Sequence, residues 1–346
     1  MAKGRRKNKH RSQLNFIVVL LVSAVVAYGF LSSAQERWGL NLGLPEIDIP
    51  GASAITDRIG DIVGSVGGAR NQSRPIMDNA MLVSAPIAEA IDYPIAVHML
   101  DVGQAESILI VAPEKNVLID AGDNGQGPMI MRYLQSQGVE EIHILIATHP
   151  HADHIGGMSY IMQNMPIGLL IMPDIPEAIL PTTRTFNTFL TTIIEMEIEA
   201  QPAQPGILYD LGGGADLEIL GPGLEFSSVN DMSVISRVTY GEARFLFTGD
   251  AERAAELWLA EQENIGADVL SVGHHGSNTS SSQVFLDAVS PQVALISSGI
   301  DNSFGHPHRD VISRLSGVGA EIYRTDIHGT VIVAYDGERL FVYTER

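Results

Sequence analysis

Residues 149–154 of this 346-residue chain read His-Pro-His-Ala-Asp-His, which places three imidazoles and one carboxylate within six residues. Imidazole nitrogen and carboxylate oxygen are ligands that zinc and similar divalent ions use in proteins. His149 and His151 lie two residues apart, so extended backbone points both side chains the same way, whereas Asp153 and His154 are adjacent and face a second position. The spacing favours two metal ions held side by side. The alternative, a histidine-rich surface loop, explains neither the aspartate nor the flanking sequence.

The flanking residues predict the elements that position this cluster. Residues 141–148 are a short apolar run with isoleucine at 142, 144 and 146, which is typical of a buried strand. Residues 155–158 follow as the opening of a helix. The cluster is therefore expected at the carboxyl end of a strand, where open α/β sheets bind their ligands.

Short apolar runs alternate with helix-like patterns through the rest of the chain, which predicts an α/β fold. Strands are expected at residues 95–100, 107–112, 117–119, 142–147, 167–172, 217–220, 234–239, 244–248, 268–272, 292–297, 330–335 and 339–343. Helices are expected at residues 128–137, 155–164, 184–197, 251–263, 281–289 and 309–317. Gly212-Gly213-Gly214 is interpreted as a turn, because it lacks the strand and helix context of a nucleotide-binding loop.

Seven motifs in a fixed order resemble the metallo-β-lactamase superfamily, and in particular its ComEC-type branch, the hydrolase domain of DNA-uptake competence proteins. They are residues 98–107 (HMLDVGQAES), 117–122 (VLIDAG), 149–154 (HPHADH), 247–250 (FTGD), 272–277 (VGHHGS), 304–307 (FGHP) and 323–326 (YRTD). The resemblance covers about residues 95–346. It implies a four-layer αβ/βα sandwich, in which two sheets pack face to face with helices outside.

The resemblance also implies a role for each metal ligand. His149 and His151 would hold the first of two divalent metal ions, zinc or manganese, and Asp153 and His154 would hold the second. Asp250, at the end of a strand, would bridge both ions. The alternative for Asp250 is a cap of the helix expected at 251–263.

Two further ligand questions stay open in the sequence. His274 or His275 would complete the second metal position, and His274 is preferred because it is nearer the strand end. Asp120 follows an apolar run and is either a carboxylate that orients a ligand histidine or a turn-initiating aspartate before Gly122.

The chain departs from the family pattern at two places. It has no histidine between His154 and His274, so the first metal is expected to be under-coordinated, with Asn230 and Ser233 lining its open side. An oxygen-rich site of that kind makes manganese a rival to zinc. The loop at 98–107 has Ala-Glu where the branch usually has Gly-Asp, which puts its substrate contacts in doubt.

The leading hypothesis is a metal-dependent hydrolase, most simply a phosphodiesterase or nuclease-like enzyme in which two metals activate a bridging water. Asp153 and Asp250 would serve both as metal ligands and in catalysis. His306 would bind the substrate or protonate a leaving group, unless it is a histidine that only closes a turn. Ser277 would bind a substrate oxygen. The substrate expected first is single-stranded DNA or another phosphodiester.

Charge argues against a broad nucleic-acid surface. The chain carries 21 basic and 41 acidic residues, and six of the basic residues lie within residues 1–11. The remainder has one lysine, Lys115, and is strongly acidic, whereas nucleic-acid binding normally needs a basic face. Alternative hypotheses are therefore a hydrolase of small esters or lactones, and a membrane-anchored accessory protein of DNA uptake whose metal domain is inactive.

The amino-terminal part predicts a membrane attachment. Residues 1–13 are a basic, cytoplasmic segment, and residues 14–34 are a transmembrane anchor or a signal peptide, because 14–31 are almost continuously apolar. Residues 35–92 are interpreted as a flexible linker and residues 93–346 as the hydrolase domain. That domain is expected outside the cytoplasm, single-pass anchored at the cell membrane or secreted.

Overall fold

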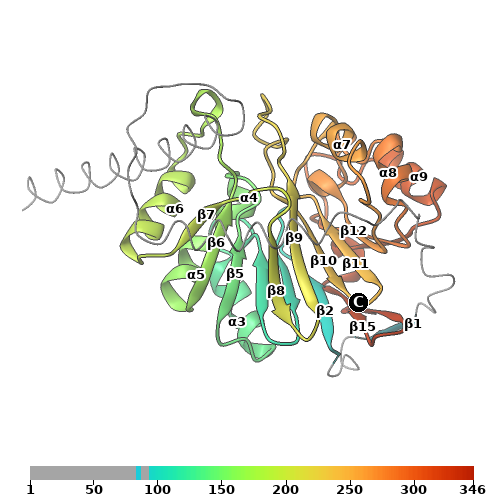
Figure 1. The fold of residues 1–346 in the computed structure, drawn as a ribbon, viewed down its shortest axis with the longest axis horizontal. Coiled ribbons are helices and arrows are strands. Elements are labelled where there is room, and N and C mark those ends of the chain that lie inside the picture. The colour runs from blue at the N-terminus through green and yellow to red at the C-terminus, as the bar shows by residue number, and fades with distance from the viewer. Residues whose placement is uncertain (1–82, 87–92) are drawn as a thin grey trace, which may run out of the picture. The chain divides into compact units, whose positions relative to one another are not determined.

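A computed structural model describes residues 83–86 and 93–346 of the chain, which form two β-sheets packed face to face with helices on the outer faces (Figure 1). The apolar segment at residues 14–34, expected to be an anchor or signal peptide, lies outside the described residues. Among the helices of the described ranges, none combines the length and the apolar character that a membrane crossing requires.

The first sheet has nine strands in the order β1-β16-β15-β2-β3-β4-β5-β6-β7. These are β1 (Val83–Pro86), β2 (Ile95–Met99), β3 (Ile108–Val111), β4 (Asn116–Ile119), β5 (Ile142–Ile146), β6 (Ile167–Met172), β7 (Ala200–Pro202), β15 (Val331–Tyr335) and β16 (Leu340–Thr344). Strands β4 to β7 are parallel, whereas β15, β2, β3 and β4 pair antiparallel.

The second sheet has seven strands in the order β14-β13-β12-β11-β10-β9-β8. These are β8 (Leu208–Gly212), β9 (Ala215–Gly221), β10 (Ile235–Tyr240), β11 (Ala243–Phe247), β12 (Val269–Ser271), β13 (Val293–Ile296) and β14 (Glu321–Arg324). Strands β11 to β14 are parallel, which gives each sheet one parallel half.

The alternation of side chains along the strands separates three apolar layers. Ile108 and Ile110 of β3 point between the sheets, where they pack in one core with Phe245 and Phe247 of β11. Leu109, between the first two, points outward to the helices that cover the first sheet. The predicted four-layer α/β sandwich is confirmed.

Two sets of helices form the outer layers (Figure 1). The first sheet is covered by α3 (Gly127–Ser136), α5 (Met158–Asn164) and α6 (Arg184–Glu195), and the second by α7 (Arg253–Ala260), α8 (Gln283–Val289) and α9 (Arg309–Gly317). Each set buries an apolar face against its sheet, which fixes where the loops at the strand ends lie.

The structure adds elements that the apolar pattern did not indicate. Val83–Pro86, within the segment interpreted as a linker, pairs parallel with β16 and forms one edge of the first sheet. The helix expected at 155–164 is two helices, α4 (Ala152–Ile155) and α5, which are separated by Gly156-Gly157. The short strands β7, β8 and β14 pair at sheet edges, where few apolar residues are needed and the sequence signal is correspondingly weak.

One buried histidine in this framework makes stability depend on pH. His98 of β2 is 4% exposed, with Nδ1 2.9 Å from the hydroxyl of Tyr133. Burial lowers the pKa of His98 from 6.5 to about 4. Below pH 6.5 the unfolded chain therefore gains a proton that the folded protein does not accept, so stability falls as the pH drops toward 4, by about 3 kcal/mol in total from this residue.

His98→Asn, which keeps a polar partner for Tyr133, is expected to flatten this dependence. Urea unfolding of both proteins near pH 7.5 and pH 4 measures the difference between the two profiles. Parallel profiles for the wild type and the variant would contradict the role of His98.

Candidate metal centre

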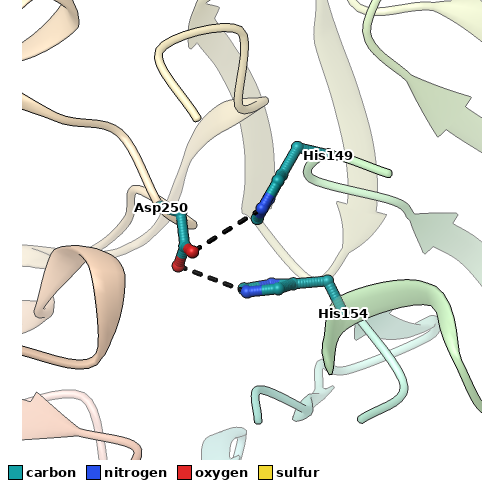
Figure 2. A group of neighbouring side chains, drawn as sticks. All are labelled: His149, His154 and Asp250. Atoms are coloured by element: carbon teal, nitrogen blue, oxygen red, sulfur yellow. Dashed lines mark ion pairs between the residues drawn. The ribbon is translucent and has the colours of Figure 1, made fainter. Parts of the chain in front are cut away.

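Asp250 lies at the centre of the histidine cluster. It follows β11, and its buried carboxylate faces His149 and His154, which follow β5 of the other sheet (Figure 2). Asp250 Oδ2 is 3.6 Å from His149 Nε2, and Oδ1 is 3.2 Å from His154 Nε2. The carboxyl ends of parallel strands from both sheets therefore meet at this carboxylate.

Each oxygen of Asp250 also faces one of the paired histidines that follow β12. His274 Nε2 is 3.7 Å from Oδ2, the oxygen that faces His149. His275 Nε2 is 3.8 Å from Oδ1, the oxygen that faces His154. The carboxylate is thus surrounded by four imidazoles, two on each side.

The remaining residues of the hexapeptide extend these two sides. His151 Nδ1 is 2.9 Å from His149 Nε2, and His151 is exposed. Asp153 Oδ2 is 3.5 Å from His275 Nε2. His149 and His154 thus face different oxygens of Asp250, although their ring centroids lie only 4.2 Å apart. His274 faces the same oxygen as His149, and His275 the same oxygen as His154.

This arrangement differs from the preference for His274 at the second position. His275, not His274, lies beside Asp153 and His154, while His274 faces the Asp250 oxygen that His149 also faces. The local backbone explains why both rings reach the centre: His274 and His275 have φ of 50° and 53°, so consecutive side chains do not alternate as they would in a strand. Such left-handed conformations are costly for residues other than glycine and concentrate at functional sites.

Close backbone approaches hold the hexapeptide in place. α4 begins at Ala152, directly after extended His151, so Asp153 and His154 lie in a helical turn. A Cβ at Gly157 would lie 2.2 Å from the Ala121 carbonyl oxygen. Glycine is required there because the turn packs directly on the loop that carries Asp120.

Burial and charge act in opposite directions on the central groups. Burial disfavours the charged form of Asp250, but the surrounding imidazoles, His154 foremost, hold its pKa well below the ordinary value. Burial also disfavours charge on His154, yet Asp250 and Asp120 raise its pKa well above the ordinary value. Burial and the nearby His154 lower the pKa of His149. The centre is thus a fixed carboxylate among imidazoles that compete for positive charge.

Asp120 acts on His154 from behind. Its carboxylate is fully buried, accepts hydrogen bonds from the Thr148 amide at 2.8 Å and the Thr148 hydroxyl at 2.6 Å, and lies 2.6 Å from His154 Nδ1. This contact leaves His154 Nε2 for the centre. The geometry favours the orienting role over a turn-initiating aspartate.

Glu252 contacts Nδ1 of His274 with its carboxylate, as Asp120 contacts Nδ1 of His154. The residue pattern did not indicate this role for Glu252. Glu252 Oε1 lies 3.1 Å from His274 Nδ1 and accepts a hydrogen bond from the Thr279 hydroxyl at 2.8 Å. His275 Nδ1 instead donates to the Ser297 carbonyl at 3.0 Å. The local signal for Glu252 is its position two residues after Asp250 on extended backbone.

Glu252→Gln is expected to weaken metal binding by about 10- to 100-fold, because the amide holds His274 less firmly and adds no negative charge. Competition with a chromophoric chelator measures the affinity. Glu261→Gln, at the exposed end of α7, is the matched control. Equal affinities for the two variants would show that Glu252 does not position His274.

Residues 230–233, which were expected to line the first metal, instead make hydrogen bonds to Asp250, Glu252 and the start of α7. The Ser233 hydroxyl is buried and accepts a hydrogen bond from the Asp250 amide at 3.1 Å. Asp231 accepts the amides of Glu252 and Ala255 and so caps α7, the alternative that the sequence left open for Asp250. Asn230 donates to Glu252 at 3.4 Å, and its Oδ1 is buried without a partner.

The segment at 98–107 contacts the hexapeptide through Glu106. Glu106 is 1% exposed, and its amide donates to the Asp153 carbonyl at 3.0 Å. Burial raises the pKa of Glu106 to about 7, although nearby His154 acts in the opposite direction. Glu106, whose substrate contacts the sequence put in doubt, is therefore buried and contacts the hexapeptide.

His306 and Ser277 lie beside the centre. The His306 ring is centred 5.7 Å from His274 and 6.5 Å from His275. Burial, followed by the neighbouring imidazoles, lowers its pKa to about 4. The Ser277 hydroxyl, predicted to bind a substrate oxygen, is 2.9 Å from the hydroxyl of Thr279 and accepts a hydrogen bond from the Thr279 amide at 3.4 Å.

The buried polar atoms of the centre fit divalent metal ions. His154 Nε2, Asp250 Oδ1 and His275 Nε2 are buried and make no hydrogen bond. Ligand atoms about 2.0–2.2 Å from a tetrahedral ion lie about 3.3–3.6 Å from each other. The 3.2–3.8 Å separations around Asp250 are of this size.

Known proteins similar to the chain share this region. A sequence model of the Metallo-beta-lactamase superfamily matches residues 100–299. Recombination protein 2 of Haemophilus influenzae is 34% identical over 72% of this chain and 30% of its own length. Competence protein ComA of Neisseria gonorrhoeae is 33% identical over 68% and 32%, and ComE operon protein 3 of Bacillus subtilis is 29% identical over 69% and 33%. The match thus spans about a third of each relative.

Proposed function

Because the chain belongs to the metallo-β-lactamase superfamily, we propose that it is a metal-dependent hydrolase of phosphodiester bonds. The similar competence proteins are consistent with the ComEC-type branch of that superfamily. The observation that carries the proposal is the buried carboxylate of Asp250, with two imidazoles facing each of its oxygens.

The geometry supports a different allocation of ligands from the one the sequence suggested. His149, His151 and His274 would hold the first ion, with Asp250 Oδ2. Asp153, His154 and His275 would hold the second, with Asp250 Oδ1. His274 thereby supplies the third imidazole that the middle of the chain lacks.

This allocation bears on the identity of the metal. Three imidazoles at the first position suit zinc, and they weaken the argument for manganese that rested on an oxygen-rich site. The carboxylates of Asp153 and Asp250 at the second position suit either ion. When bound, a pair of such cations lowers the pKa of a water to supply a nucleophile and polarises the substrate oxygen.

The chain's own groups would bind and orient the substrate around that nucleophile. The side-chain oxygen of Gln104, Oε1, accepts a hydrogen bond from the Gly299 amide at 3.0 Å. This contact directs the side-chain NH₂ group of Gln104 toward His306 Nδ1, which is 3.3 Å away. His306 Nδ1 is then an acceptor, so the neutral ring carries its proton on Nε2. We therefore assign His306 the role of donating a hydrogen bond to a substrate oxygen or to the leaving group.

A second candidate function is an accessory protein whose metal domain binds without catalysis. The strongly acidic composition favours it over a nuclease, since a polyanionic substrate gains little from the surface as a whole. The same observation keeps small esters and lactones as alternative substrates.

The test is a substrate panel on the full chain after chelation and reloading with zinc or manganese. We expect hydrolysis of a simple phosphodiester and of single-stranded DNA that depends on added metal. Asp153→Ala should abolish it without unfolding the protein, whereas Asp216→Ala, at an exposed position of β9, should not. Bound metal without hydrolysis of any diester, ester or lactam would establish the accessory function instead.

A further inference from the structure

An exposed aromatic ring stands next to the candidate metal centre. Phe304 is 64% exposed, and its ring is stacked on His306 with a centroid separation of 5.6 Å and an interplanar angle of 27°. The His306 ring is nearly parallel to His275 as well, at 6.5 Å and 27°. A series of three rings therefore leads from the centre to solvent and ends in a free aromatic face.

The loop that carries Phe304 is held firmly. Asn302 Oδ1 accepts the amides of Phe304 at 3.2 Å and His306 at 3.0 Å, and its Nδ2 donates to the carbonyls of Gly299 and His306 at 2.9 and 2.6 Å. The Phe304 ring is therefore presented on a braced loop. A planar partner can stack on it without the cost of ordering the backbone.

The same loop exposes a second large apolar side chain. Ile300 is 62% exposed. An exposed apolar patch rimmed by polar residues is a candidate surface for ligand contact. The chemistry offered by the loop is a flat apolar face, which suits a planar aromatic group.

The net charge of the chain bears on how a nucleic acid strand could bind. With a net charge of −20, the chain offers little general attraction for a phosphate backbone, so a nucleic acid strand would need another source of affinity. Stacking of a base on an aromatic side chain supplies such affinity, and it tolerates any sequence because every base has a π-face.

We infer that Phe304 is a stacking platform for a nucleobase that flanks the scissile phosphate of the proposed diester substrate. This inference rests on the proposed phosphodiesterase function. The base on Phe304 would place the neighbouring phosphate within reach of His306 and the centre. Base stacking, rather than attraction of the phosphate backbone, would then make the chain prefer a strand that carries bases over one that lacks them.

The test compares two single-stranded oligomers of equal length and charge with the full, metal-loaded chain. One oligomer is oligothymidylate and the other has abasic sites throughout, and both have phosphorothioate linkages to slow hydrolysis. Calorimetry is expected to show about tenfold tighter binding of the base-bearing oligomer. Phe304→Ala should remove the preference, and Phe304→Trp should restore it.

Leu208→Ala is the matched control, since Leu208 is 63% exposed on the edge strand β8 and should not affect the preference. Equal binding of both oligomers by the wild type, no binding of either, or a preference that persists in Phe304→Ala would each overturn the inference.

Cleavage of the corresponding unmodified oligomers separates this inference from the proposed function. Metal-dependent cleavage of both oligomers without a base preference would retain the phosphodiesterase and reject the platform. A preference that depends on Phe304, with no cleavage under either metal, would retain the platform and reject the phosphodiesterase.

Discussion

Asp250→Asn is expected to lower hydrolysis by about 10³-fold or more and to prevent the chain from retaining a pair of divalent ions. The carboxylate faces His149 and His274 with one oxygen and His154 and His275 with the other. Asparagine has nearly the same shape but replaces one oxygen with an NH₂ group and removes the negative charge. Neither set of imidazoles would then face the charged oxygen that the proposed pair of ions would share.

Two measurements check this expectation. Metal content after gel filtration reports the ions retained, and initial rates with saturating zinc or manganese report activity. Asp216→Asn, at an exposed aspartate of β9, controls for the loss of one negative charge. A variant that kept both ions and lost less than tenfold in rate would show that Asp250 does not bridge.

Asp120→Ala is expected to destabilise the fold by about 3–5 kcal/mol. The fully buried carboxylate accepts two hydrogen bonds from Thr148 and contacts His154, so its removal leaves buried polar groups without partners. Asp120 also has a φ of 56°, a conformation that aspartate and asparagine tolerate better than alanine. Both effects act in the same direction.

Asp120→Asn separates the two contributions. Asparagine tolerates the backbone and keeps one acceptor oxygen, so its loss should be smaller, about 1–3 kcal/mol. Urea unfolding in the presence of chelator measures both variants without a contribution from metal. A loss below about 1 kcal/mol for Asp120→Ala would mean that the carboxylate does not hold the Thr148 loop.

Side-chain chemistry that is local in the sequence was predictable. The hexapeptide His149–His154 carries its own spacing, and the run before it identifies the strand, so a cluster of imidazoles and a carboxylate after β5 was predictable. Short apolar runs between helix-like patterns likewise predicted the α/β class, whereas the four-layer sandwich was implied by the family resemblance. The edge strand Val83–Pro86 has no such pattern, and only its pairing with β16 reveals it.

The sequence by itself determined the α/β class and the imidazole and carboxylate side chains of the candidate centre, since both follow from short-range patterns. Tertiary structure decided which histidine of the pair after β12 serves which side of Asp250, because that depends on two left-handed residues, which a residue pattern does not specify. It also decided the partners of the ligands. Glu252 reaches His274 across 22 residues and Asp120 reaches His154 across 34. Such contacts exist only once neighbouring parallel strands, β11 with β12 and β4 with β5, bring their carboxyl ends together.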